Sequence, residues 1–216
     1  MPRSAKTPCG IAAVGAIAAL LTFPACAAPQ VYEYRIEHPT YGAIGTYTNS
    51  VDNIGNNTEV VTNLHVAVKV FGIVVFREDA QRTELWRSDR LTSFEGLTTT
   101  NGHKIEIHGE ARDEGFVINS PSGISVAPAN VHPSNPWSVK IFDSNVMMST
   151  KTGKLFDVRL IADVEKSIML DGVIETLHQY EVDGEQKQLI WLNDRGVTVA
   201  FRILESGVPI DFVLIR

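Results

Sequence analysis

Residues 91–111 read LTSFEGLTTTNGHKIEIHGEA, and this stretch decides the fold class. Asn101 and Gly102 form its centre, and Asn-Gly between two strand-like segments is the strongest short-range signal for a two-residue hairpin turn. After the turn, Ile105 and Ile107 alternate with polar residues, which is the period of a strand with one apolar face. So short a turn joins only antiparallel neighbours, because parallel strands need a longer crossover. The stretch therefore predicts an antiparallel β-hairpin.

The same alternation and the same kind of turn recur along the chain. Apolar and polar residues alternate over residues 63–70, 156–163 and 197–204. Further turn signals are the dipeptides Asp171-Gly172, Asp183-Gly184, Arg195-Gly196 and Ser206-Gly207. We therefore expect a mainly all-β fold, an antiparallel meander of about 10–13 strands. Strand twist should curl so long a meander into a barrel or half-barrel, with a pair of packed sheets as the alternative.

Residues 127–153 interrupt this pattern and contain three prolines. Ser134 or Asn135 could cap a short helix that has Pro136 in its first position. We expect one short helix or helical turn near residues 134–148, within a long loop. This loop should divide the strands into two groups inside one domain.

The first 27 residues have the pattern of a secretory signal. Two basic residues precede an apolar run over residues 10–21, and Ala25-Cys26-Ala27 fits a cleavage site. The run is too short to cross ~30 Å of hydrocarbon as a helix. We expect cleavage near Ala27, which would leave a periplasmic or secreted protein with a single β-rich domain over residues 28–216. Lipid attachment at Cys26 is the alternative.

Charge and cysteine content exclude several classes of function for the cleaved chain. Residues 28–216 contain 17 Lys and Arg against 25 Asp and Glu, and this acidic balance argues against nucleic acid and anionic membranes as partners. Cys9 and Cys26 both precede the expected cleavage site, so the cleaved chain would have no disulfide and no cysteine nucleophile. No later segment is apolar enough to predict a transmembrane helix.

No motif in the sequence predicts a metal, a cofactor or a catalytic residue. His103 and His108 are five residues apart, so in a strand they would point to opposite faces. Residues 123–127 (GISVA) resemble a nucleophile elbow but lack its last glycine and its strand–turn–helix context. An enzyme would need a cleft in which histidines such as His65, His108 or His178 meet a carboxylate.

The candidate ligand-binding residues are aromatic. Trp86, Trp137 and Trp191 could be core or rim residues of the curved sheet, since tryptophan buries a large area and needs a partner for its N–H. They could instead line an apolar cavity, with the segment around Trp137 as a lid. We expect Phe71 and Phe76 to belong to the same site.

Several segments together resemble a family of bacterial exported proteins catalogued only as a domain of unknown function. They are VKVFGIVVFR at 68–77, ELWRSDRL at 84–91, Ala127-Pro128, Asn135-Pro136-Trp137 and STKTG at 149–153. The likeness spans nearly the whole cleaved chain, and it implies no residue roles because the family has no assigned activity. More distantly, the order of strands resembles the curved sheets of periplasmic lipoprotein carriers and lipocalin-like domains. This second likeness implies that the concave face binds acyl chains or other apolar molecules.

Three functional hypotheses follow. The leading one is an exported, non-enzymatic binding or carrier protein for an apolar or amphipathic, lipid-like ligand. The second is a structural or interaction module of the cell envelope, which would hold a protein partner through an edge strand or apolar patch. The third is an envelope hydrolase with an unrecognised site.

Overall fold

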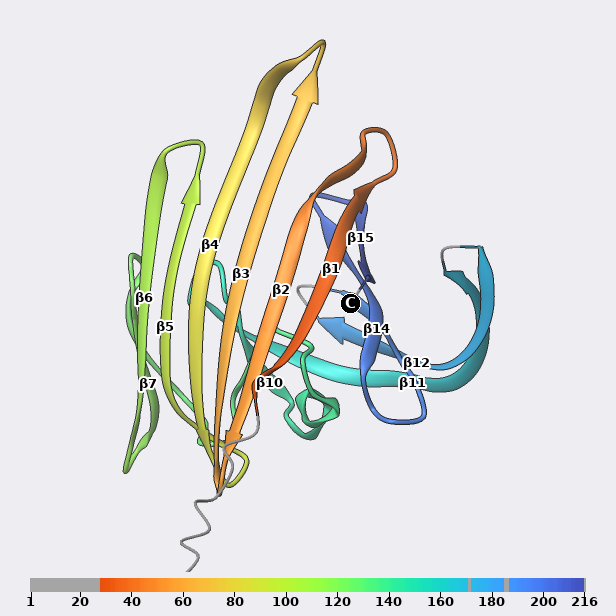
Figure 1. The fold of residues 1–216 in the computed structure, drawn as a ribbon. Coiled ribbons are helices and arrows are strands. Elements are labelled where there is room, and N and C mark those ends of the chain that lie inside the picture. Colours follow the sequence, from red (N-terminus) through yellow and green to blue (C-terminus); the bar gives the residue numbers. More distant parts are fainter. Residues whose placement is uncertain (1–27, 171, 185–186, 216) are drawn as a thin grey trace, which may run out of the picture.

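Figure 1 shows the computed structural model of the protein, which describes residues 28–170, 172–184 and 187–215. The expected signal sequence, with Cys9 and Cys26, lies outside these residues. The described chain forms fifteen strands and one 3-10 helix, η1 (Val139–Asp143). The strands are β1 (Gln30–His38), β2 (Gly42–Ile54), β3 (Asn57–Val70), β4 (Ile73–Arg87), β5 (Arg90–Thr100), β6 (His103–Arg112), β7 (Gly115–Ser120), β8 (Gly123–Ala127), β9 (His132–Pro133), β10 (Val146–Met148), β11 (Leu155–Leu170), β12 (Val173–Gly184), β13 (Gln188–Leu192), β14 (Thr198–Glu205) and β15 (Val208–Leu214).

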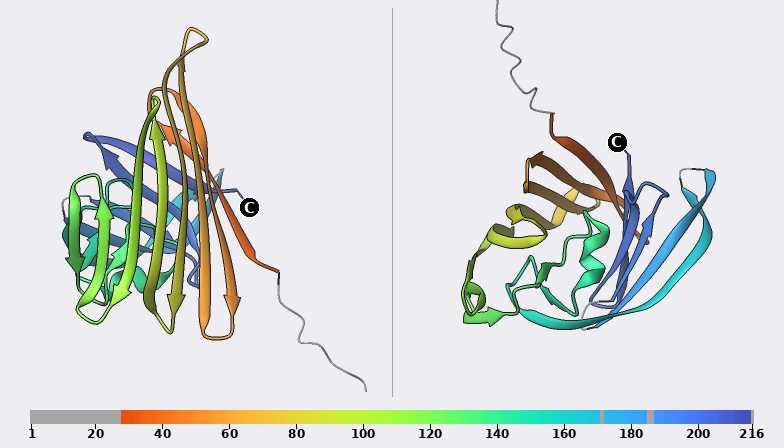
Figure 2. Two further views of the ribbon diagram at one scale, coloured as in Figure 1. Left: turned by 90° about the vertical axis from the view of Figure 1, so that its left-hand side faces the viewer. Right: turned by 90° about the horizontal axis from the view of Figure 1, so that it is seen from below.

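All fifteen strands belong to one curved sheet. Consecutive strands pair with each other within the series β1 to β8 and again within the series β9 to β15. β1 also pairs with β15, with Tyr34 opposite Leu214, whereas β8 and β9 are the two edges. The sheet therefore curves around a central space without closing, as the view from below in Figure 2 shows. Neighbouring strands are antiparallel except for β9 and β10, which are parallel.

This architecture confirms the predicted all-β, curled antiparallel meander. The strand count exceeds the expected 10–13 because β9 and β10, of two and three residues, lie within the segment predicted as a loop. Such short strands have too few residues to show a period of two in the sequence. They form because β10 pairs with the long strand β11, Met147 lying opposite Phe156.

Most of the predicted turns are at the expected positions. Asn101 and Gly102 both have positive φ, at 49° and 88°, as a type I′ hairpin turn requires. The turn predicted at Asp183-Gly184 is the exception, because both residues are still in β12. A Cβ on Gly184 would lie 2.5 Å from the carbonyl oxygen of Asp157 in β11. This glycine therefore permits close approach of two strands rather than a turn.

The predicted helical turn is η1, but it begins later than expected. Ser138 is its N-cap, and the Ser138 side chain accepts a hydrogen bond from the backbone N–H of Lys140. Ser134 and Asn135 are therefore not the caps, and Asn135 is buried in a hydrogen-bond network described below. η1 lies inside the curve of the sheet (Figure 2).

The inner face of the sheet holds two large apolar clusters. One contains Tyr34, Tyr47, Phe201 and Phe212 from β1, β2, β14 and β15, and the other contains aromatic and aliphatic residues of β2 to β8. β10 lies between them, because Met147 packs in the first cluster and its neighbour Met148 in the second. The segment between β8 and β11 thus fills part of the interior instead of lying on the surface.

Candidate ligand cavity

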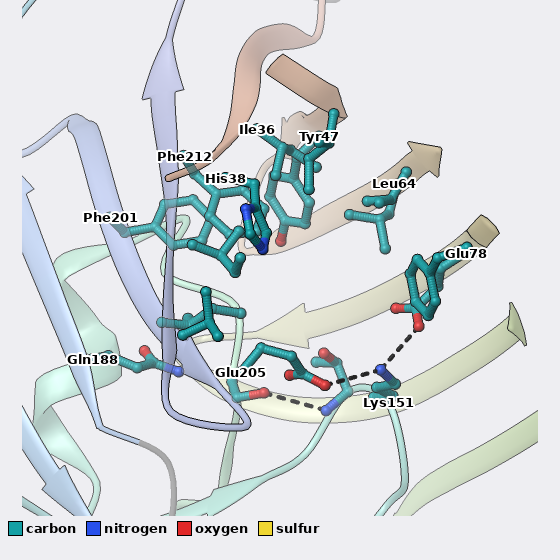
Figure 3. A pocket seen from close by; sticks show the side chains of 18 of the residues that line it. Ile36, His38, Tyr47, Leu64, Glu78, Lys151, Gln188, Phe201, Glu205 and Phe212 are labelled. Carbon is teal, nitrogen blue, oxygen red and sulfur yellow. Dashed lines mark hydrogen bonds and ion pairs between the residues drawn. The ribbon is translucent and has the colours of Figure 1, made fainter. Parts of the chain in front are cut away.

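A cavity of about 320 Å³ lies on the inner face of the sheet beside the first cluster. Strands β1 to β4 form one side of the cavity, strands β13 to β15 form the opposite side, and residues 149–151 close one end (Figure 3). The even-numbered residues of β3 and β4 reach it because successive side chains of a strand point to opposite faces. Leu64, Val66 and Val68 come from β3, whereas Phe76, Glu78 and Arg82 come from β4.

One wall of this cavity is aromatic and rigid. The rings of Phe201 and Phe212 are stacked, with centroids 4.2 Å apart and planes 12° apart. Tyr47 meets both rings edge-on, at 5.6 Å from Phe201 and 5.5 Å from Phe212. Edge-to-face and offset-stacked pairs of this kind stabilise a core beyond the area they bury. The wall therefore has a fixed shape.

The opposite end of the cavity is charged. Lys151 Nζ lies 2.9 Å from a carboxylate oxygen of Glu78 and 3.5 Å from one of Glu205 (Figure 3). Glu78 also accepts a hydrogen bond from the Thr100 hydroxyl at 2.8 Å. Burial opposes the charge of Lys151, but its contacts with Glu78 and Glu205 outweigh this and raise the pKa of Lys151. The cavity thus joins an apolar wall to a polar end.

A buried hydrogen-bond network lies beside the cavity and links the segment between β8 and β11 to the sheet. Glu84 of β4 accepts bonds from Asn135 Nδ2 at 2.9 Å and from the indole N–H groups of Trp86 and Trp137, each at 3.0 Å. The Tyr47 hydroxyl donates to Asn135 Oδ1 at 2.6 Å. Burial raises the pKa of Glu84 to about 6, although these donors favour the ionised carboxylate.

The five aromatic residues predicted to share a site are in different places. Trp86 and Trp137 are together, with ring centroids 5.9 Å apart, and they line a second cavity of about 370 Å³. Phe76 lines the first cavity, and Phe71 is fully exposed at the turn between β3 and β4. Trp191 is buried in a third, smaller cluster, where its indole N–H donates to Gln179 at 3.2 Å. Trp191 and Gln188 are three residues apart in β13, so their side chains point to opposite faces of the strand. Of the two, Gln188 lines the first cavity.

Sequence reasoning missed the polar lining residues Arg82, Lys151 and Gln188. A signal for Arg82 was present, because Arg82, Glu84 and Trp86 share one face of an alternating strand. A charged residue at an inward position is rare unless it is paired or functional. Lys151 and Gln188 carry no such signal, since their approach to β4 depends on how the whole sheet curves.

The histidines named for the enzyme hypothesis each meet one carboxylate, on separate hairpins. His65 Nδ1 lies 2.6 Å from Asp79, His108 contacts Glu95, and His178 lies 4.0 Å from Asp163. All three histidine side chains are substantially exposed. Within the described residues, no three His, Cys, Asp or Glu side chains gather in a group suited to a metal ion. No helix in that part of the chain has the length and apolar character needed to cross a membrane.

The fold and its inner cavity define an open β-barrel-like protein. A crystal structure of a "Beta-barrel-like Protein of Domain of Unknown Function DUF1849 from Brucella abortus" is similar, with a TM-score of 0.65 and 8% sequence identity. The similarity covers 88% of this chain and 96% of that chain, and it establishes the fold alone. The chain belongs to the family described as a domain of unknown function, DUF6134, whose model matches residues 42–215. This membership confirms the predicted resemblance to a domain of unknown function. No curated protein matches the sequence.

Proposed function

We propose that the protein is a non-enzymatic binding or carrier protein for an apolar or amphipathic, lipid-like ligand. The supporting observation is the cavity of about 320 Å³ with an aromatic wall and a charged end. This volume lies at the lower end of the range of about 300–1,000 Å³ for small-molecule sites, and such sites combine an apolar lining with a few polar groups. Of the five aromatic residues predicted to bind the ligand, Phe76 is the one that we assign to this cavity.

The proposal places the protein in the periplasm or outside the cell. It rests on the first 27 residues, which match a secretory signal. Native mass spectrometry of the protein from a periplasmic extract tests location and cargo together. The intact mass should correspond to cleavage after Ala27, whereas a lipid on Cys26 would indicate anchoring.

The bound ligand is tested by extracting it from the protein and then measuring whether the ligand-free protein binds an apolar probe. Organic extraction under denaturing conditions should release a reproducible apolar or amphipathic molecule, and the refolded, lipid-free protein should bind a fluorescent fatty acid. A lipid-free protein that binds no apolar probe, and a native protein without any extra mass, would together overturn the carrier function.

A matched pair of variants locates the binding. Leu64 lines the cavity and is only partly buried, whereas Leu85 is exposed on the outer face of the neighbouring strand. Leu64→Trp should therefore fill the cavity and weaken probe binding at least about 10-fold, since a bulky ring takes the ligand's space. Leu85→Trp should leave the affinity unchanged.

A second candidate, the envelope interaction module, is favoured by the turn between β3 and β4. Phe71 is fully exposed there at a φ of 49°, and Ile73, Val74 and Val75 beside it are also exposed. A photo-crosslinking residue at position 71 in intact cells should join the protein to one discrete envelope protein if this candidate is correct. A diffuse set of weak products would count against it.

A further inference from the structure

Arg82 lies buried in the wall of the cavity with most of its hydrogen-bonding capacity unused. The residue is 6% exposed, and it lines the cavity from the middle of β4. Its Nε donates to the backbone carbonyl of Thr150 at 3.0 Å. Among the described residues, its two Nη groups meet no hydrogen-bond acceptor, and no carboxylate forms an ion pair with it. A buried guanidinium normally has such a partner, because an unpaired buried charge is costly.

The two carboxylates that share its face have other partners. Glu78 forms its ion pair with Lys151 and accepts a bond from Thr100. Glu84 has both oxygens taken by Asn135 and two indole N–H groups. Burial is the largest influence on Arg82 and outweighs the attraction of nearby groups, so the pKa of Arg82 is lowered. Glu78 and Glu84 attract the charge of Arg82, but among the described residues neither carboxylate forms an ion pair with it.

A second polar group of the same cavity is also without a partner. Gln188 of β13 is 2% exposed, and its Oε1 is buried with no hydrogen bond (Figure 3). Buried polar atoms of this kind are few in native proteins and call for an explanation such as a bound molecule. Arg82 and Gln188 come from opposite walls of the cavity, and their deficits differ, because the Nη groups of Arg82 need an acceptor whereas Oε1 of Gln188 needs a donor.

We propose that the ligand is a single-chain amphipathic carboxylate whose acidic group binds the Nη atoms of Arg82, with its apolar chain against the wall of Phe201 and Phe212. This inference rests on the proposed function and adds the chemistry of the headgroup. The planar guanidinium fork matches a carboxylate in a bidentate geometry, and charge-assisted bonds of this kind are the strong ones.

Charge and size select this class among anionic lipids. Arg82 and Lys151 carry two positive charges against the two carboxylates of Glu78 and Glu205, so any negative charge of the ligand beyond the one bound at Arg82 is repelled by those carboxylates. A phosphate monoester with two charges would therefore bring an unpaired negative charge near Glu78. A lipid with two acyl chains needs more space than a cavity of about 320 Å³ provides.

The experiment is a headgroup series on the full-length, lipid-free wild-type protein. Dodecanoate, dodecanol, dodecylamine and dodecyl phosphate share one chain, and their affinities are measured by displacement of a neutral fluorescent probe at about pH 8. Dodecanoate should bind about 10- to 100-fold more tightly than dodecanol, and the amine and the dianionic phosphate should bind more weakly than dodecanoate.

Two arginine variants provide the local test. Arg82→Met should lose the preference for dodecanoate over dodecanol while it keeps the affinity for dodecanol. Arg77→Met is the matched control, because Arg77 is exposed on the same strand and pairs with Asp79 outside the cavity. If Arg82→Met does not fold, the wild-type series still decides the proposal.

The outcomes separate this inference from the proposed function. Equal affinity of the wild-type protein for dodecanoate and dodecanol would overturn the headgroup assignment and leave the carrier function standing. Tighter binding of dodecyl phosphate would overturn the single-charge argument. Failure to bind any member of the series, together with the neutral probe, would overturn both.

Discussion

Glu84 is fully buried and still accepts three hydrogen bonds from N–H groups, so two opposing effects act on its carboxyl group. Desolvation favours the neutral acid, while the donors favour the carboxylate, and burial is the larger influence. The pKa is therefore about 6 in the folded chain, against 4.5 for a solvated glutamate. Because the folded state holds this proton more tightly than the unfolded state, acidification should favour folding at this site.

Glu84→Gln removes this titration and tests its sign. Relative to the variant, the wild-type protein should be most stable below about pH 4.5 and should lose about 2 kcal/mol of that difference as the pH rises above 6. Urea unfolding of both proteins at about pH 4.5, 5.5 and 7 measures the difference. A difference that grew with pH would contradict the assignment of the raised pKa to Glu84.

His132 should respond to pH in the opposite sense. It packs against Trp86 with ring centroids 4.8 Å apart, and burial lowers its pKa to about 4, although Asp143 and Asp89 favour the protonated form. The neutral ring contributes stability above pH 6.5 that is lost as the pH falls toward 4, up to about 3 kcal/mol. His132→Phe keeps a ring at this position and cannot titrate.

Thermal unfolding of the wild type and His132→Phe between about pH 7 and 4 checks this expectation. The wild type should lose more stability than the variant over this interval. Parallel curves for the two proteins would mean that His132 is protonated in the folded protein as readily as in the unfolded chain.

At the scale of the element, the turn between β3 and β4 has the backbone geometry of a type I′ turn, but Phe71 is an unfavourable residue for its first central position. Phe71 and Gly72 have φ of 49° and 81°, the type I′ pattern that favours Asn-Gly. A bulky side chain in this left-handed region is strained, and full exposure means that Phe71 gains no burial in return. Phe71→Asn should therefore stabilise the protein by roughly 1 kcal/mol, measured by denaturant unfolding.

The turn between β5 and β6 supplies the reciprocal variant. Asn101 and Gly102 have nearly the same φ angles, and Asn101 also accepts a hydrogen bond from the Arg77 backbone N–H at 2.9 Å. Asn101→Phe should destabilise the protein by more than Phe71→Asn stabilises it, since it adds strain and removes that bond. If both substitutions left the stability unchanged, strain at these turns would not be a significant cost.

Elements whose signal is local could be predicted from the sequence, and elements defined by distant contacts could not. The turn at Asn101 is specified by two adjacent residues, so its position was predictable. Asn135 also had a local interpretation, as a helix cap, but its partner Glu84 is 51 residues away in the chain. The same limit applied to the cavity, because Arg82 and Gln188 line it together only through the curvature of the sheet, which brings β4 and β13 to opposite sides of one space.

For the whole molecule, the order of strands has a simple consequence. β1 and β15 are paired, and the backbone N–H of Ile215 donates to the carbonyl of Glu33, so the first and last strands lie side by side. The two edges, β8 and β9, are consecutive in the chain and are joined by residues 128–131. The strands thus form one meander in which β15 and β1 are paired neighbours without a chain connection between them.

A circular permutant should therefore fold. A flexible linker of about six residues, up to roughly 20 Å when extended, would join Ile215 to Gln30, and new ends would be made between the exposed residues Ala129 and Asn130. Since one short connection replaces another, the free energy of unfolding should change by less than about 2 kcal/mol. A permutant opened between Leu64 and His65 is the control. It interrupts the ladders of β3 with β2 and β4 and should not fold. Circular dichroism and urea unfolding distinguish the two, and equal loss of structure in both would show that the connection at 128–131 is itself required for the fold.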